Sequence, residues 1–210
     1  MFKLIIIGDT GVGKSCLMKR VMDDEFKTEH QVTIGVEFGS YGLRIEDKVV
    51  KMQIWDTAGQ ESYKSVTRIF YRGAHCVFLT YDITRDETFN NLTEWHKEVK
   101  QHAAEDVMVY LVGNKAELED QREVTFDRAV EWAQANGIHK CWESSAKTGL
   151  AVEEVFSCAG KDIFAKLMRE MKEQEGQKTP SGSMTPVQRR NSVTQLGKDG
   201  GVKSKDDCKC

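Results

Sequence analysis

The 210-residue sequence lacks any long apolar run, and this lack bears on membrane insertion. No stretch approaches the roughly 20 consecutive apolar residues that a helix needs to cross a bilayer. The apolar run near the N-terminus, "KLIIIG" at 3–8, is too short for a signal peptide and has no small-residue cleavage site after it. The sequence therefore predicts no membrane-spanning helix, and we expect any contact with a membrane to be made from outside the bilayer.

The sequence also has little net charge and few disulfide candidates. A formal net charge of −3 at pH 7 gives no strong field for nucleic acid, so we expect no nucleic-acid partner. None of the six cysteines forms a C-x-x-C pair or adds to a zinc-like pattern with histidine. Four of them lie in apolar-patterned segments, which predicts reduced, buried thiols of a cytosolic protein: Cys16, Cys76, Cys141 and Cys158.

The other two cysteines, Cys208 and Cys210, lie in the charged C-terminal stretch "KSKDDCKC". Cysteine is usually among the most buried residues, but the charged neighbours of this pair argue against burial. A disulfide, a metal site and a lipid attachment are all chemically open to such a pair.

Short apolar runs alternate with helical patterns along the chain. The runs at 3–8, 76–83 and 107–113 are continuous, which indicates strands buried on both faces, as in a parallel sheet. Between 36 and 56 the apolar residues alternate around a polar turn, which is typical of a β-hairpin. Apolar residues at helical spacing define three further segments, at 89–99, 126–133 and 152–167. The sequence therefore predicts an α/β fold with helices on both faces of the sheet and one antiparallel edge strand.

The composition changes after about Met171. Residues 172–210 contain both prolines of the chain, many Ser, Thr, Gly and Lys residues, and few large apolar side chains. Such a segment cannot bury enough apolar surface to offset the entropy of ordering it. We therefore expect one domain over residues 1–171 and a flexible tail over 172–210.

The segment "GDTGVGKS" at 8–15 matches the phosphate-binding pattern G-x-x-x-x-G-K-[ST] between a predicted strand and a helix-compatible segment. Its glycines allow backbone angles that turn several N–H groups inward as an anion nest, and the following helix adds its positive N-terminal dipole. Lys14 can supply a positive charge to β- and γ-phosphates, and the Ser15 hydroxyl can ligate Mg²⁺. The alternative is a glycine-rich turn with an incidental lysine, and the strand–loop–helix setting argues against it.

A second segment, "MQIWDTAGQ", offers a carboxylate for the same metal ion. Asp56 closes an apolar strand, where it can hold Mg²⁺ through a water molecule. Gly59 follows at D-x-x-G spacing, with an N–H suited to a γ-phosphate oxygen, and Gln60 is placed to orient an attacking water. Asp56 alone would be a strand-end turn residue, but together with the phosphate loop it favours a nucleotide-hydrolysing site.

Across residues 1–171 the sequence resembles the Rab family of small GTPases. The resemblance is carried by "GDTGVGKS", "TIGVEF", "WDTAGQE", "NKAEL" and "SSAK", in that order, and by the C-x-C end. It implies the P-loop small G-protein fold, with a mostly parallel six-stranded sheet and one antiparallel edge strand. It also implies a switch that binds GTP or GDP with Mg²⁺ and hydrolyses GTP slowly unless a GTPase-activating protein assists.

The resemblance also implies roles for individual residues. It gives catalysis to Gln60, Lys14 and Thr33, and metal binding to Ser15, Thr33 and Asp56. Phe26 matches the aromatic residue that packs on guanine. The full nucleotide-binding set that it implies is Gly8, Asp9, Thr10, Gly11, Val12, Gly13, Lys14, Ser15, Cys16, Phe26, Thr33, Asp56, Gly59, Asn114, Lys115, Glu117, Ser145, Ala146 and Lys147.

One position departs from the family pattern. The base-reading motif is N-K-x-D in such proteins, and this chain has "NKAE", which puts Glu117 at the aspartate position. A carboxylate there accepts two hydrogen bonds from the N1–H and N2–H₂ edge of guanine. Glu117 keeps the charge but holds its carboxylate one CH₂ further out. We therefore expect guanine specificity to be kept and affinity to be weakened.

The resemblance further implies partners and a location. Phe38, Trp55 and Phe70 match an aromatic triad that Rab proteins present to effectors, although ordinary core packing is the alternative for all three. Cys208 and Cys210 match a pair that accepts geranylgeranyl groups, which would anchor the protein to the cytoplasmic face of intracellular membranes. The implied partners are effectors, an exchange factor, a GTPase-activating protein and a GDP-dissociation inhibitor or escort protein. We expect the G domain itself to be monomeric.

Two other function classes stay open at this point. One is a different P-loop enzyme, such as an ATPase or a small-molecule kinase, against which the guanine motifs argue. The other is a pseudo-GTPase scaffold that binds nucleotide, with base affinity altered by Glu117, but does not hydrolyse it. Gln60 and Thr33 argue against this alternative.

Overall fold

A computed structural model of the chain describes residues 1–27, 33–59 and 64–176. In these residues six strands form one sheet in the order β2-β3-β1-β4-β5-β6. Every neighbouring pair is parallel except β2 and β3, which form the predicted hairpin at one edge. The strands are β1 (Phe2–Ile7), β2 (Val36–Ile45), β3 (Lys48–Thr57), β4 (Cys76–Asp82), β5 (Met108–Asn114) and β6 (Lys140–Glu143). The predicted α/β class, strand number and antiparallel edge strand are therefore confirmed.

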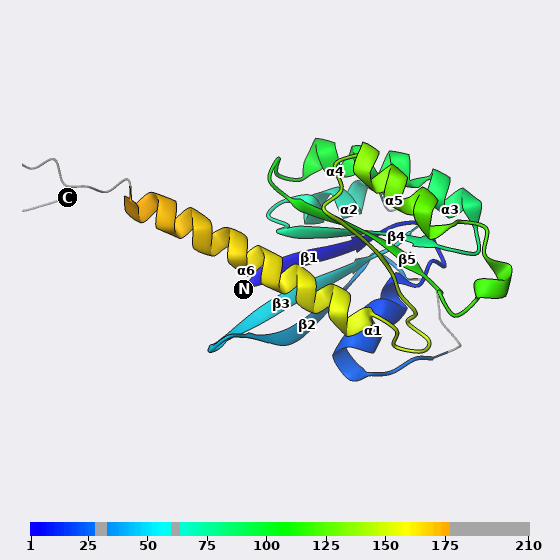
Figure 1. Ribbon diagram of the computed structural model, residues 1–210, viewed down its shortest axis with the longest axis horizontal. Coiled ribbons are helices and arrows are strands. Elements are labelled where there is room, and N and C mark those ends of the chain that lie inside the picture. Colours follow the sequence, from blue (N-terminus) through cyan, green and yellow to red (C-terminus); the bar gives the residue numbers. More distant parts are fainter. Residues whose placement is uncertain (28–32, 60–63, 177–210) are drawn as a thin grey trace, which may run out of the picture.

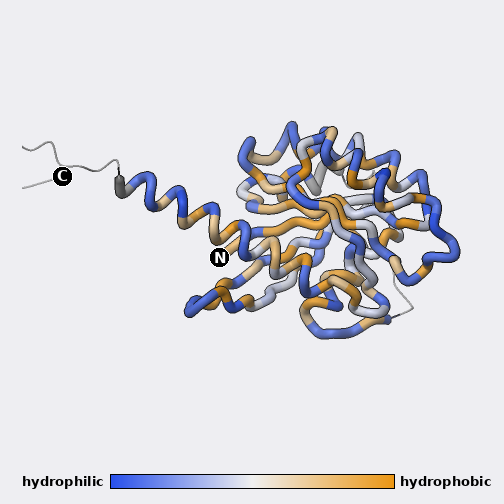
Figure 2. The backbone as a smooth tube through the Cα atoms, in the orientation of Figure 1, coloured by the Kyte–Doolittle hydropathy of each residue, from blue (hydrophilic) through white to orange (hydrophobic). Residues whose placement is uncertain are grey.

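Helices cover both faces of the sheet (Figure 1). On one face lie α1 (Lys14–Asp23) and α6 (Val152–Gly176). On the other face lie α2 (Lys64–Tyr71), α3 (Asp86–Asn90), α4 (Leu92–His102) and α5 (Phe126–Ala135), and a short 3₁₀ helix, η2 (Glu119–Gln121), precedes α5. The chain tube in Figure 2 shows the same layering, with hydrophobic strands inside and hydrophilic residues frequent along the outer helices.

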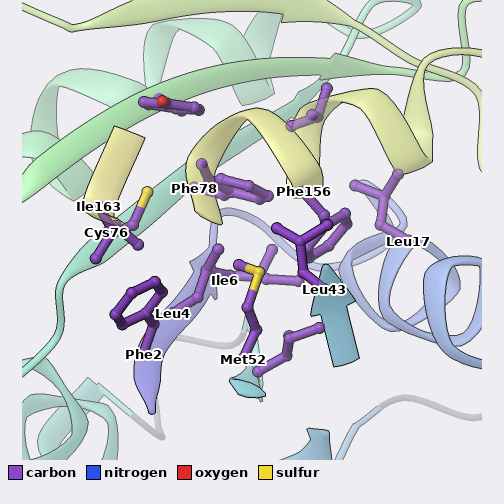
Figure 3. Close-up of a cluster of buried hydrophobic side chains, with 14 of the residues drawn as sticks. Phe2, Leu4, Ile6, Leu17, Leu43, Met52, Cys76, Phe78, Phe156 and Ile163 are labelled. Carbon is purple, nitrogen blue, oxygen red and sulfur yellow. The ribbon is translucent and has the colours of Figure 1, made fainter. Parts of the chain in front are cut away.

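Each central strand feeds two cores because its side chains alternate between the faces. On β1, Leu4 and Ile6 enter the core under α1 and α6, whereas Ile5 and Ile7 enter the core under α2 to α5. Figure 3 shows the first core, where Phe156 of α6 packs edge-on against the ring of Phe78 at 5.0 Å between centroids. Burial on both faces explains why these strands are continuously apolar in sequence.

The helices differ from the predicted pattern in two places. The apolar stripe over 89–99 predicts one helix, but α3 ends at Asn90 and α4 begins at Leu92, with Asn91 joining them. The helix α6 continues past Met171 to Gly176, so residues 172–176 are helical although the composition there favours a tail. Local composition misses this extension because a helix that is already nucleated adds each further residue at low cost. The division into domain and tail stays a prediction.

The four cysteines of the described domain are all free thiols. Cys76, in the middle of the sheet, is buried as predicted, but the prediction of burial is wrong for the other three, which are half-buried: Cys16, Cys141 and Cys158. Cys16 lines a surface cleft, Cys141 lies on the edge strand β6, and Cys158 lies beside the Lys140 ammonium at 2.9 Å. Fewer elements cover these places than cover the central strands.

None of the helices in the described part of the chain is both long enough and apolar enough to cross a bilayer.

Replacing Phe156 with alanine should destabilise the fold far more than the same change at Phe126. Phe156 is 1% exposed, whereas Phe126, the first residue of α5, is 41% exposed although it belongs to the predicted apolar stripe. Removing a buried phenyl ring costs about 3–5 kcal/mol, because it loses packing contacts and leaves a cavity. Urea unfolding of both variants, each saturated with the same concentration of GDP, measures the difference. Equal losses of stability would contradict the assignment of Phe156 to the core.

Candidate functional site

The parallel strands all end at one edge of the sheet, and the loops that follow them surround a cleft. This is the usual place for a ligand in an open α/β sheet, since neighbouring crossovers diverge there. The cleft has a volume of about 280 Å³. Its lining comes entirely from the set predicted from sequence: Thr10, Gly11, Gly13, Lys14, Ser15, Cys16, Phe26, Thr33, Gly59, Asn114, Lys115, Glu117, Ala146 and Lys147.

The phosphate loop between β1 and α1 owes its shape to glycine at two close approaches. Gly8 has φ 140°, and a Cβ there would lie 2.1 Å from the Thr80 carbonyl oxygen on β4. Gly13 has φ 96° and caps α1, and a Cβ there would lie 2.2 Å from the Asn114 amide nitrogen. The loop can therefore approach its neighbours only without side chains at these positions, and its N–H groups lie at the positive end of α1.

Lys14 is the positive group of this loop and is almost completely buried, at 6% exposure. Its ammonium donates to the carbonyl oxygens of Gly8 and Asp9, at 2.9 and 2.8 Å. Burial lowers the pKa of Lys14 to about 8, against the opposing effect of the Asp56 and Asp9 carboxylates. A phosphate group in the cleft would add negative charge and favour the ammonium form.

Three oxygen-bearing side chains meet beside Lys14. The Ser15 and Thr33 hydroxyl oxygens are 2.8 Å apart, and the Ser15 hydroxyl donates to the Asp56 carboxylate. Asp56 is fully buried, its second oxygen has no hydrogen-bond partner, and burial raises its pKa to about 6. Two hydroxyls and a carboxylate are the hard oxygen donors that suit Mg²⁺, and the positive ion would favour the ionised form of Asp56. These three predicted metal-site residues therefore fit the ion.

The base side of the cleft is built around Asn114, at the end of β5. Its amide nitrogen donates to the Val12 carbonyl at 2.8 Å, and its amide oxygen accepts from the Ala146 N–H at 3.1 Å. One side chain thus holds the phosphate loop and the loop after β6 together. From the other side, Arg20 of α1 donates to the carbonyl oxygens of Ala146 and Lys147 at 2.8 and 2.9 Å. The backbone at 146 and 147 is therefore fixed from two directions.

Glu117 lines the cleft, and its Oε2 atom is buried without a hydrogen-bond partner. A buried carboxylate oxygen with no donor is costly, so a ligand that brings a donor to it gains free energy. The N–H groups at the edge of guanine are donors of this kind. Lys115, two residues earlier, also lines the cleft, and its ammonium lies 2.5 Å from the Asp82 carboxylate.

The other predicted residues shape the cleft, as Gly59 and Ser145 do, or lie outside the described chain. Gly59 packs against the phosphate loop, because a Cβ there would lie 2.4 Å from the Thr10 nitrogen. Ser145 is fully buried and accepts from the Thr148 N–H at 3.0 Å, which shapes the 145–149 turn. Gln60 lies outside the described residues, as do Cys208 and Cys210.

Two residues that support the site were not predicted from sequence. Asp82, at the end of β4, pairs with both Lys115 and Arg85, and Arg85 also donates to the Thr10 carbonyl at 3.0 Å. Burial opposes ionisation of Asp82, but hydrogen bonds from Lys115 and Thr84 outweigh it and keep its pKa below the usual value. The sequence did contain a signal for Asp82, because this carboxylate lies at the end of an apolar strand, just as that of Asp56 does.

Comparison with known families agrees with this geometry. A sequence model of the Ras family matches residues 3–165. The chain belongs to the Ras family. Its sheet, phosphate loop and cleft are those of a P-loop small G protein, and the protein is a small GTPase that acts as a GTP-binding switch.

Shortening Glu117 to aspartate should slow the release of GDP. We expect aspartate to tighten binding by about 1–3 kcal/mol, the scale of a hydrogen bond to a charged group made with better geometry. Dissociation of a fluorescent GDP analogue measures the effect, and Glu119→Asp is the matched control because that carboxylate pairs with Arg122 at the surface. Equal release from parent and Glu117→Asp would mean that Glu117 adapts fully to guanine. Competition by ATP as strong as that by GTP would overturn the guanine assignment itself.

Proposed function

We propose that this protein is a Rab-like switch, which in its GTP form recruits effectors and thereby regulates vesicle and membrane traffic. The observation that carries the proposal is a partly exposed aromatic triad built across the segments that flank the nucleotide cleft. The "TIGVEF" and "WDTAGQE" motifs and the C-x-C end support the same subfamily.

The triad lies on the hairpin and on α2. Trp55 of β3 is flanked by Phe38 of β2 and Phe70 of α2, each with its ring centroid 4.9 Å away. Phe38 is 51% exposed, which is more than a core role needs, whereas Trp55 and Phe70 pack against the core under α2 to α5. Lys3 borders the triad, 5.6 Å from the Trp55 ring and 5.9 Å from the Phe70 ring. Aromatic side chains are enriched at the centres of protein–protein binding sites.

Two residues of the triad lie close in sequence to residues of the nucleotide cleft. Phe38 is five residues from Thr33, whose hydroxyl lies in the metal-site cluster, and Trp55 precedes Asp56 of the same cluster. The Ala58 N–H donates to the Gly35 carbonyl at 2.9 Å, which joins the two segments. If Thr33 and Gly59 hold the γ-phosphate, loss of that phosphate on hydrolysis releases both segments and changes the surface that an effector contacts.

Hydrolysis in this proposal depends on positioning and charge. Lys14 and the loop N–H groups neutralise the phosphates, and Gln60 orients the attacking water. Ser15, Thr33 and Asp56 would hold Mg²⁺, which supplies further neutralising charge when bound. We expect a slow intrinsic rate and a GTPase-activating protein that raises it by about 10³–10⁵-fold.

The remaining partners and the location in the cell follow from the C-terminal cysteines. Geranylgeranyl groups on Cys208 and Cys210 would place the protein on the cytoplasmic face of intracellular membranes. One lipid chain gives only marginal binding, and two give stable anchoring. Cycling through the cytosol then requires a GDP-dissociation inhibitor or escort protein that covers the lipids, and reactivation requires an exchange factor.

Replacing Gln60 with leucine should lower GTP hydrolysis and leave GTP binding intact, because the volume is kept and the group that orients water is lost. We expect a loss of at least about tenfold in rate, which is 1.4 kcal/mol of transition-state stabilisation. Single-turnover phosphate release measures it, with Gln134→Leu on the exposed side of α5 as the matched control. An unchanged rate, with and without an activating protein, would remove Gln60 from the mechanism. No hydrolysis by the parent would favour a nucleotide-binding scaffold instead.

Replacing both Cys208 and Cys210 with serine should move the protein from membranes to the cytosol while folding and GDP binding stay unchanged. Membrane fractionation of cells that express each variant measures this. Cys158→Ser is the control, because it removes a half-buried thiol of the domain. If the double variant still sediments with membranes as the parent does, lipid anchoring through these cysteines is wrong.

A further inference from the structure

The side chain of Asp9 in the phosphate loop contacts α4 and its preceding residue. One carboxylate oxygen accepts from the Trp95 indole N–H at 2.7 Å, and the other accepts from the Asn91 amide at 2.8 Å. Trp95 is 4% exposed and lies in the first turn of α4, and Asn91 directly precedes that helix. The two oxygens of Asp9 thus meet two donors from another part of the chain, more than 80 residues away.

The pairing is chemically specific at both ends. An indole N–H and an amide NH₂ are donors, and a carboxylate offers a separate acceptor oxygen to each of them at once. Charge-assisted hydrogen bonds are stronger than neutral ones. An apolar side chain of similar shape at position 9, such as leucine, would leave both donors facing an apolar group.

The backbone of Asp9 lies between two groups that serve the nucleotide. Its carbonyl oxygen accepts from the Lys14 ammonium at 2.8 Å. Gly59 approaches the same carbonyl group, since a Cβ on Gly59 would lie 2.4 Å from the Asp9 carbonyl carbon. A shift of Asp9 would therefore displace both the lysine that neutralises phosphate and the glycine that approaches it.

The helix α4 also contacts α2. Glu98, one turn after Trp95, pairs with Arg68 of α2 at 3.2 Å and with His102 at 3.4 Å. The anchor for Asp9 is thus a helix that is itself held against a neighbour, so it can fix the loop in position.

We propose that Asp9 is a positioning residue, which holds the phosphate loop in its nucleotide-retaining shape through Trp95 and Asn91. It acts on the nucleotide through Lys14 and Gly59 and need not touch it. The inference rests on guanine-nucleotide binding alone and is independent of the proposed role in membrane traffic.

The test removes the acceptors of Asp9 in the full-length protein, and the readout is the release of a fluorescent GDP analogue. Asp9→Leu keeps a similar side-chain shape and leaves the Trp95 and Asn91 donors without a partner, so we expect release to become about tenfold faster or more. Asp9→Asn keeps an acceptor for Trp95 and lets Asn91 turn its amide to accept from the new NH₂ group. We expect its release rate to lie between those of the parent and Asp9→Leu.

Asn90→Ala is the matched control. Asn90 is the same residue type one position earlier, and its side chain bonds to Asp86 and Arg128 and not to the phosphate loop. We expect its GDP release to stay within about twofold of the parent, as for an ordinary surface change. Trp95→Phe keeps an aromatic ring and removes the indole donor, so release should accelerate.

The outcomes separate the possible failures. Parent-like release from Asp9→Leu, or release from Asp9→Asn as fast as from Asp9→Leu, would overturn the positioning role, since the hydrogen bonds would then not matter. Release rates that follow the thermal unfolding midpoint across all variants, Asn90→Ala included, would also overturn it, since they would show general destabilisation. A parent protein that retains no GDP would instead contradict nucleotide binding itself.

Discussion

A buried amide group, that of Asn114, connects the parts of this protein that have to act together. It joins the phosphate loop at Val12 to the backbone of Ala146, and this fixes the distance between the phosphate side and the base side of the cleft. Asn114 is 1% exposed and ends β5, a strand whose residues are all buried. The sheet therefore positions the amide, and the amide positions the loops. Without this cross-link the two sides of the cleft would be separate loops on a common edge.

The buried charges of the cleft explain why ligand binding and protonation are coupled here. Burial lowers the pKa of Lys14 and raises that of Asp56, so it shifts each of them toward its neutral form. A phosphate favours the charged lysine, and a divalent cation favours the charged aspartate. The protein thus keeps two groups in an environment that disfavours their charges, and the nucleotide with its ion offsets that cost. Because the side chains of Lys14 and Asp56 are already held in place, they need little rearrangement when the ligand binds.

The fold and most of the cleft could be predicted from sequence because the signals are local. A continuous apolar run such as β4 requires burial on both faces, and the phosphate motif specifies its own loop shape. The break at Asn91 could not be predicted, because the apolar side chains on its two sides keep helical spacing. The contacts of Asp9 and Asp82 were also out of reach. Asn91 and Trp95 lie more than 80 residues from Asp9. Lys115 directly follows β5, the strand beside the one that Asp82 ends, so only the fold brings these partners together.

The length of α6 has a mechanical consequence. Its 25 residues make a rod of about 37 Å, whereas a seven-residue strand such as β5 spans only about 23 Å. The surplus extends beyond the sheet as a stalk (Figure 1). Its exposed residues there, Met171 to Gln174, are mostly polar, as expected of a helix surrounded by water. A molecule or surface attached to the end of this helix is kept at a distance from the domain. The length of α6 therefore limits how closely the domain can approach its attachment point.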